Sequence, residues 1–138
     1  MFNADTYNGY TITKLTSAGD TSWSKIYELV NATVYGTHLA ACMDRSWQFI
    51  CSPVGNSIIS VDTITGQVLA AKKLTVPLQD ALSIRFIAVT DNNDKIVLAK
   101  DQSTYSDDGY VLIRLRSDLS SIIWTKHIRA ANLFFHGM

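Results

Sequence analysis

The sequence has few charged residues and no excess of either sign. Charged residues make up 17% of the 138 positions, and twelve Lys and Arg balance twelve Asp and Glu. Nucleic-acid-binding proteins usually carry a basic excess, because their phosphate contacts need Lys and Arg. The composition therefore argues against a nucleic-acid partner, and Ser, Thr and Asn are expected to supply most of the polar surface.

Membrane and secretory segments are also missing from the sequence. The opening residues, MFNADTYNGY, have neither the basic region nor the apolar stretch of a signal peptide. No apolar run approaches the roughly 20 residues of a membrane helix. We therefore expect a soluble protein without membrane insertion. Work outside a cell would need another route of release, such as the lysis that frees a phage particle.

Two cysteines are too few for a disulfide framework. Cys42 and Cys51 lie in the runs HLAACM and WQFIC, and the DRS between them predicts a hairpin with its turn centred at 44–45. In that register Cys42 faces Trp47 and Cys51 faces His38, so the thiols are not cross-strand partners. Both are expected to be buried free thiols.

Catalytic and metal-binding motifs are absent as well. The chain has no G-x-S-x-G elbow, CxxC pair, P-loop or HExxH sequence. His38, His127 and His136 have no metal-ligand spacing. The TDNND run at 90–94 lacks the spacing and distal Glu of a calcium loop, so it predicts a hairpin turn. We expect no enzymatic activity, metal or cofactor, and an enzyme with a site shared between chains is the alternative.

Short apolar runs separated by turn clusters fill most of the chain. The one segment with a helical period, SWSKIYELVNATV, has β-branched neighbours that argue against a helix. Regular short strands predict an all-β sandwich, barrel or propeller. The turn clusters are NG at 8–9, SAGD at 17–20, MDRS at 43–46, TITG at 63–66, TDNND at 90–94 and SDDG at 106–109.

The chain repeats itself with a period of about 50 residues. GYTITKLTSAGDTSWSK returns as GYVLIRLRSDLSSIIWTK, and Trp23 and Trp124 occupy matching positions in the two runs. Each unit reads as a hairpin, a linker of about ten residues and a second hairpin, which makes four strands. We divide a single domain, 1–138, into about 2.75 units, at 1–53, 54–100 and 101–138.

A four-stranded unit of this length is the sequence signature of a β-propeller blade. The pattern G-Y-x-I-x-K-L-x-S-x-G-x-x-x-W-x-K resembles the blade repeat of quinoprotein-like bacterial β-propellers. Similar runs occur in virion structural and tail-associated proteins of bacteriophages. The middle copy departs from the pattern, with Ala70 in place of the tryptophan. The resemblance implies propeller-like blades, and no residue set for a quinoprotein cofactor can be carried over.

The recurrent residues divide into core and surface candidates. The shared register of Trp23 and Trp124 favours a core role between blades over sugar-stacking platforms. Gly19 and Gly66 recur with the blades and are expected to be structural. The loops before the Gly-Tyr strands carry the candidate partner-binding residues Tyr7, Tyr105, Asp5, Asp101, Asp107 and Asp108. The alternative is that these loops are ordinary turns, since Asn-Gly and Asp-Gly are hairpin signals.

The two ends of the chain match complementary parts of one blade, since MFNADTYNGY aligns with VLAKDQSTYSDDGY. We therefore expect a homo-oligomer whose seams are completed by two chains, with three copies near a closed ring. A fragment of a longer propeller and an open stack are the alternatives.

The resemblance implies a non-enzymatic virion module, tail-associated, that contacts other virion proteins or a host-surface glycan multivalently. The alternative is a lectin-like oligomeric propeller, extracellular or cytoplasmic, that binds carbohydrate through Trp and Tyr.

Overall fold

The computed structural model describes residues 9–28, 39–52, 56–75, 82–101 and 109–129. These residues form ten strands and contain no helix, so none of them makes a helix that could span a membrane. The all-β prediction is confirmed. The strands are β1 (Gly9–Leu15), β2 (Thr21–Glu28), β3 (Ala40–Met43), β4 (Gln48–Ser52), β5 (Ser57–Asp62), β6 (Val68–Lys73), β7 (Leu82–Val89), β8 (Lys95–Asp101), β9 (Gly109–Leu115) and β10 (Ile122–Arg129).

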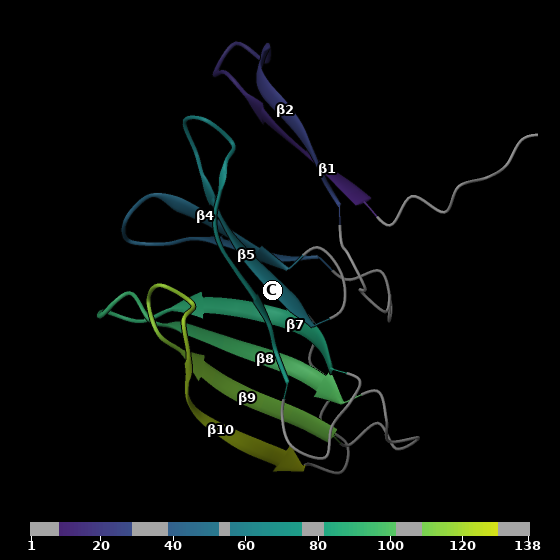
Figure 1. Ribbon diagram of the computed structural model, residues 1–138, viewed down its shortest axis with the longest axis vertical. Coiled ribbons are helices and arrows are strands. Elements are labelled where there is room, and N and C mark those ends of the chain that lie inside the picture. The colour runs from purple at the N-terminus through teal and green to yellow at the C-terminus, as the bar shows by residue number, and fades with distance from the viewer. Residues whose placement is uncertain (1–8, 29–38, 53–55, 76–81, 102–108, 130–138) are drawn as a thin grey trace, which may run out of the picture.

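The strands form three open antiparallel sheets, and each is an up-and-down meander (Figure 1). We call them the hairpin sheet (β1-β2), the middle sheet (β3-β4-β5-β6) and the last sheet (β7-β8-β9-β10). Strands that are consecutive in the chain are neighbours in each sheet, which is the order of a propeller blade. The prediction of four-stranded antiparallel sheets is confirmed, and the described sheets do not close into a barrel.

The sheets group the hairpins differently from the rows of the sequence repeat. Strands β4 and β5 lie on either side of the 53/54 division and pair with each other. Strand β8 runs across the 100/101 division and pairs with β9. Each four-stranded sheet therefore combines the second hairpin of one unit with the first hairpin of the next. A sequence period fixes the spacing of equivalent strands but leaves the starting strand of each sheet open.

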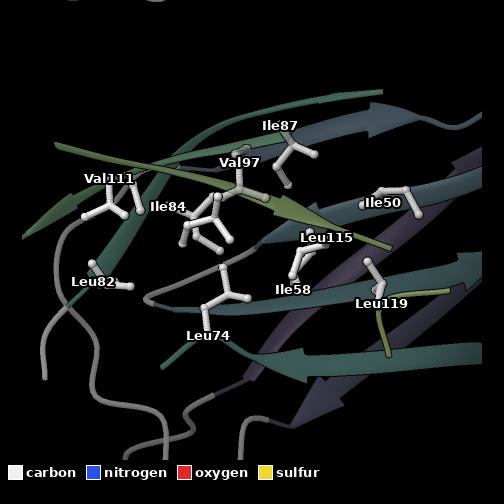
Figure 2. Close-up of a cluster of buried hydrophobic side chains, with 13 residues drawn as sticks. Ile50, Ile58, Leu74, Leu82, Ile84, Ile87, Val97, Val111, Leu115 and Leu119 are labelled. Atoms are coloured by element: carbon white, nitrogen blue, oxygen red, sulfur yellow. The ribbon is translucent and has the colours of Figure 1, made fainter. Parts of the chain in front are cut away.

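The larger core lies between the middle and last sheets (Figure 2). Strand β9 alternates in burial, with Val111, Ile113 and Leu115 fully buried on one side. These side chains belong to the same cluster as Ile50 and Ile58 of the middle sheet. Burying one such side chain contributes roughly 1.5–3 kcal/mol. The two sheets approach most closely where β3 lies against β7.

The hairpin sheet covers the opposite side of the middle sheet. Tyr27 forms a second buried cluster with Cys51, Ile59 and Val61, and Trp23 packs against it. The Tyr27 hydroxyl donates a hydrogen bond to the Gly66 carbonyl at 2.6 Å. The middle sheet is therefore buried on both sides, which explains why four consecutive residues of β5, 58–61, are buried.

The predicted register of the β3–β4 hairpin is wrong. Cys42 pairs with Ile50 and Cys51 pairs with Ala41. The predicted partners were Trp47 for Cys42 and His38 for Cys51. The turn is longer than predicted because Trp47 takes a positive φ of 60° and forms a bulged turn. Both cysteines are free, as predicted, and Cys51 is buried whereas Cys42 is half-buried.

Candidate functional site

Five described hairpin turns lie at one end of the three sheets, which we call the turn end (Figure 1). Each turn joins the two strands of a hairpin and is closed by a pair of backbone hydrogen bonds. Within each four-stranded meander, the two described turns emerge at the same end. Contacts of Lys14 with Thr63 and of Arg45 with Thr90 place the turns of neighbouring sheets side by side. The turn end comprises residues 16–20, 44–48, 62–67, 90–94 and 116–121.

Each of these turns contains one residue with a positive φ. Two are glycines, Gly19 and Gly66, with φ of 92° and 72°. The other three are Trp47, Asn93 and Leu119, with φ between 60° and 65°. Asn tolerates this conformation, whereas a bulky side chain there costs about 1–2 kcal/mol. A tryptophan held in such a turn is a strained position, and strain of this kind marks candidate contact sites.

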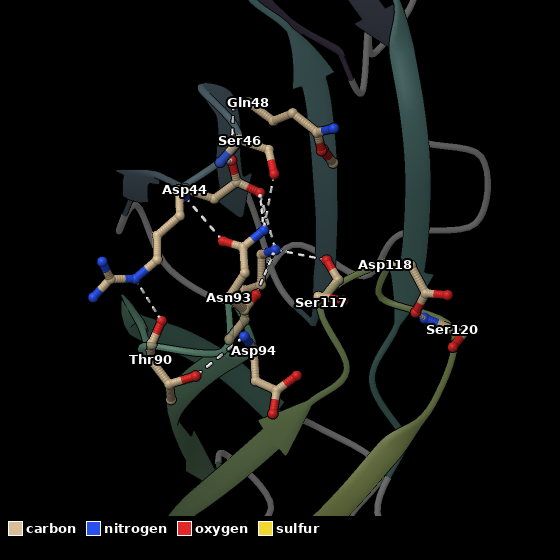
Figure 3. A network of polar contacts seen from close by, with 12 residues as sticks. Asp44, Ser46, Gln48, Thr90, Asn93, Asp94, Ser117, Asp118 and Ser120 are labelled. Atoms are coloured by element: carbon tan, nitrogen blue, oxygen red, sulfur yellow. Dashed lines mark hydrogen bonds and ion pairs between the residues drawn. The ribbon is translucent and has the colours of Figure 1, made fainter.

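A buried ion pair lies beneath the turn end (Figure 3). The Lys95 Nζ is 3.0 Å from the Asp44 carboxylate, and both side chains are almost fully buried. The same ammonium group donates to the Asn93 carbonyl at 2.9 Å and to the Ser117 carbonyl at 2.6 Å. All three ammonium protons therefore have acceptors, which is what makes a buried lysine tolerable.

Asp44 accepts hydrogen bonds from its own turn and from the neighbouring β7–β8 hairpin. One carboxylate oxygen accepts from the Ser46 amide at 2.8 Å and the Gln48 amide at 2.9 Å. The other accepts from Asn93 Nδ2 at 3.2 Å and from Lys95. Burial alone would raise the pKa of Asp44, but the Gln48 amide and Lys95 outweigh it and the pKa lies below its usual value.

Arg45 bridges two neighbouring turns at the surface. Its amide donates to Asn93 Oδ1 and its Nε to the Thr90 carbonyl, both at 2.9 Å. Its guanidinium also pairs with the exposed Asp91. Below this bridge, Arg114 pairs with Asp94 at 2.7 Å. TDNND is a hairpin turn, as the sequence predicts, and its polar side chains hold the middle and last sheets together.

These contacts leave little that resembles a catalytic centre among the described residues. The charged groups of the network are paired with one another, so none is a free base. Burial, with a contribution from Cys42, raises the pKa of the Cys51 thiol to about 12, so the reactive thiolate is scarce at neutral pH. In the part of the chain that the structure describes, no three His, Cys, Asp or Glu side chains gather as a metal site.

The exposed apolar side chains of the turn end are the features most suited to binding. Trp47 is 77% exposed and Ile64 is 79% exposed. The two turns that carry them are joined, because the Thr63 hydroxyl donates to the Trp47 carbonyl at 3.0 Å. Sequence reasoning missed Trp47. The available signal was that this tryptophan, unlike Trp23 and Trp124, directly follows a turn cluster and lies outside the repeat register.

Most of the predicted partner-binding residues lie outside the described part of the chain. Asp101 is described, and it is buried at the end of β8, opposite Leu82 and at the far end of the sheet from the turns. His127 of β10 is exposed. Outside the described residues lie Tyr7, Tyr105, Asp5, Asp107, Asp108, His38 and His136.

The two repeated tryptophans have different surroundings. Trp23 packs against the cluster beneath the hairpin sheet, and its Nε1 donates to the Thr63 carbonyl at 3.1 Å. Trp124 is half-buried on the outer side of the last sheet, where the Lys126 ammonium lies 5.3 Å from its ring centroid. The same strand position is therefore an internal contact in one hairpin and a surface contact in the other.

The chain matches no known family model, and no curated protein is similar to it.

Proposed function

We propose that the chain is a non-enzymatic structural and binding module of a bacteriophage virion, associated with the tail. The observation that carries this proposal is the stack of repeated sheets with every described hairpin turn at one end. Such a stack is a rigid support, and its turn end displays Trp47 and Ile64 to partners. The paired charges and the buried thiol beneath it favour a structural over a catalytic role.

Multivalency is the mechanism of the proposed module. Several copies of the chain, three in the simplest ring, would present their turn ends together to other virion proteins or to a host-surface glycan. Each single contact is then weak, and the linked contacts raise the overall avidity by 10²–10⁴.

A lectin-like propeller is the second candidate function. It is favoured by the exposure of Trp47 in the same turn as Arg45, which pairs with Asp91, since sugar sites combine an aromatic face with polar groups. Trp124 is the other described tryptophan with a surface position.

Antibodies raised against the purified chain test the virion assignment. We expect them to label the tails of phage particles whose genome encodes this sequence, in negatively stained micrographs. Protein mass spectrometry of the same purified particles should detect the chain. Its absence from intact particles would contradict the virion proposal.

A glycan array separates the two candidate functions. Carbohydrate binding by the wild-type chain that is lost in Trp47→Ala, with an unchanged circular dichroism spectrum, would favour the lectin. Ile64→Ala is the matched control for loss of an exposed apolar side chain at the turn end.

A further inference from the structure

The two internal interfaces of the chain join the same two kinds of sheet face. We call the forward face of a sheet the one that packs on the next sheet along the chain, and the backward face the opposite one. On the middle sheet, Ile50, Ile58 and Leu74 lie on the forward face. Cys51 and Val61 lie on its backward face, under the hairpin sheet. Forward-to-backward packing therefore occurs twice within the chain.

The hairpins β1–β2, β5–β6 and β9–β10 occupy equivalent places in the three sheets. Trp23 of β2 pairs with Lys14 of β1. Ala70 of β6 and Trp124 of β10 pair at the corresponding places with β5 and β9. A register shift adjoins this pair in all three hairpins. Because Trp23 and Ala70 lie on forward faces that are covered, Trp124 marks the forward face of the last sheet.

The forward face of the last sheet has no described sheet packed on it, and it carries apolar side chains together with Lys100, Arg114 and Lys126. Its side chains belong to neither buried cluster. Phe86, on the edge strand β7, is 54% exposed. The apolar members of this face are Phe86, Ile96, Leu98, Leu112, Trp124 and Ile128.

The backward face of the hairpin sheet is uncovered in the same sense. Leu15 and Ile26 lie on it and are 57% and 66% exposed. The exposed Thr11, Thr13 and Ser24 share this face, so it is more polar than the covered backward faces. Leu15 is the last paired residue of its strand, as Val61 and Leu115 are in the other two hairpins. Those two side chains are both 0% exposed, because a forward face covers each of them. Among the described sheets, one forward face and one backward face thus have no other sheet packed on them.

Polar contacts at the covered interfaces also have open counterparts on the last sheet. Trp23 Nε1 donates to the Thr63 carbonyl, and Lys72 Nζ donates to the Ser120 carbonyl at 3.3 Å. Each donor thus reaches a turn of the following sheet. Trp124 and Lys126 hold the equivalent donors on β10, and among the described residues no carbonyl accepts from them.

We propose that a second copy of this chain covers the forward face of the last sheet with the backward face of its hairpin sheet. The inference rests on the self-association included in the proposed function and names the surfaces that carry it. Trp124 and Lys126 of one copy then donate to the β1–β2 turn of the next copy, as their equivalents do within the chain. The contact joins two different surfaces, so repeated copies form a ring or a filament.

Light scattering after size exclusion tests the contact on the purified full chain. We expect the wild type to have the mass of two or more chains of 15.3 kDa each. Phe86→Glu on the forward face and Ile26→Lys on the backward face should each reduce it to one chain or a much weaker association. Leu39→Glu, at an exposed position just before β3 and outside both faces, should keep the wild-type mass. All three substitute exposed side chains, and circular dichroism checks that each variant folds.

Mixing the two face variants gives the sharper result. The Phe86→Glu variant keeps an intact backward face, and the Ile26→Lys variant keeps an intact forward face. Their mixture should therefore form a complex of two chains that grows no further. A monomeric wild type would overturn the proposal, and so would an Ile26→Lys variant that keeps the wild-type mass, because the forward face would then bind itself.

The light-scattering results test the docking of copies independently of the virion assignment. A chain that is found in phage tails but is monomeric in solution contradicts only the docking of copies. A head-to-tail oligomer that is absent from phage particles contradicts only the virion role.

Discussion

At the scale of single residues, a few side chains hold positions that no other residue type would fill as well. Gly66 combines a positive φ with close packing, because a Cβ there would lie 2.9 Å from Trp23 Cε3. Lys95 and Asp44 form a buried pair whose remaining polar atoms are hydrogen-bonded. Gly66 was found from the repeat, whereas a lysine in the strand KIVLAKD gives no sequence signal that it is buried.

The two repeated glycines should differ in their tolerance of alanine. Gly66→Ala should lower the free energy of unfolding by at least about 2 kcal/mol, because both the left-handed backbone and the contact with Trp23 oppose the methyl group. Gly19→Ala should cost only about 1 kcal/mol, since φ is positive there but nothing lies within 4 Å. Urea denaturation measures both values, and equal losses would contradict the packing argument.

Removal of the buried lysine should be severe. Lys95→Met leaves the Asp44 carboxylate buried without its partner, so we expect a loss of about 3–5 kcal/mol in the free energy of unfolding. Lys72→Met removes a lysine whose only described contact is one carbonyl near the surface, and its effect should stay below about 1 kcal/mol. Urea denaturation compares the two, and a mild effect of Lys95→Met would show that Asp44 is compensated by the turn amides alone.

The lowered pKa of Asp44 predicts how the free energy of unfolding changes at acid pH. Burial opposes ionisation, but the Gln48 amide and Lys95 favour it more strongly, so the folded pKa lies below the unfolded value of about 3.9. The carboxylate therefore contributes its full stability above about pH 4, and this contribution is lost as the pH falls through the folded pKa. In Asp44→Asn, the free energy of unfolding should fall less steeply between pH 5 and the acid limit. An unchanged slope would contradict the assignment.

At the scale of elements, the sequence predicts the positions of the turns best and the grouping of hairpins into sheets worst. The clusters SAGD, TITG and TDNND each mark a turn that the structure contains. The β3–β4 register was missed because a tryptophan at positive φ is rare, so a short turn at 44–45 looked sufficient. The grouping of hairpins depends on which faces bury each other, and a period in the sequence carries no such information. The partner-binding prediction concerned loops that, apart from Asp101, lie outside the described residues, and the exposed turn-end residues went unnoticed.

Trp47 offers a test of strain within a turn. Trp47→Gly should leave the protein as stable or raise the free energy of unfolding by up to about 1 kcal/mol, because glycine relieves the positive φ and the lost side chain is 77% exposed. Leu119→Gly should instead destabilise the protein, since Leu119 has the same backbone conformation but is buried in the larger core. Thermal unfolding followed by circular dichroism distinguishes the two, and a destabilised Trp47→Gly would assign a packing role to that tryptophan.

At the scale of the whole molecule, the chain is a directional stack of three sheets with different surfaces at its two ends. The middle sheet has both faces covered, whereas no described sheet packs on one face of the hairpin sheet or on one face of the last sheet. Self-association through these faces would bind only the folded state, so the Tm should rise with protein concentration. Differential scanning fluorimetry over a hundredfold range of concentration measures this rise. The Tm of Phe86→Glu should be constant over the same range, and a constant Tm in the wild type would argue against association.

The repeated use of forward-to-backward packing has an evolutionary consequence. A gene duplication that added another four-stranded unit to the middle of the chain would place a forward face against a backward face at both new junctions. Such an insertion would need no newly evolved interface, and its turns would emerge beside those already present. The length of the stack is therefore free to drift by whole units, while the two end faces stay under selection for whatever covers them.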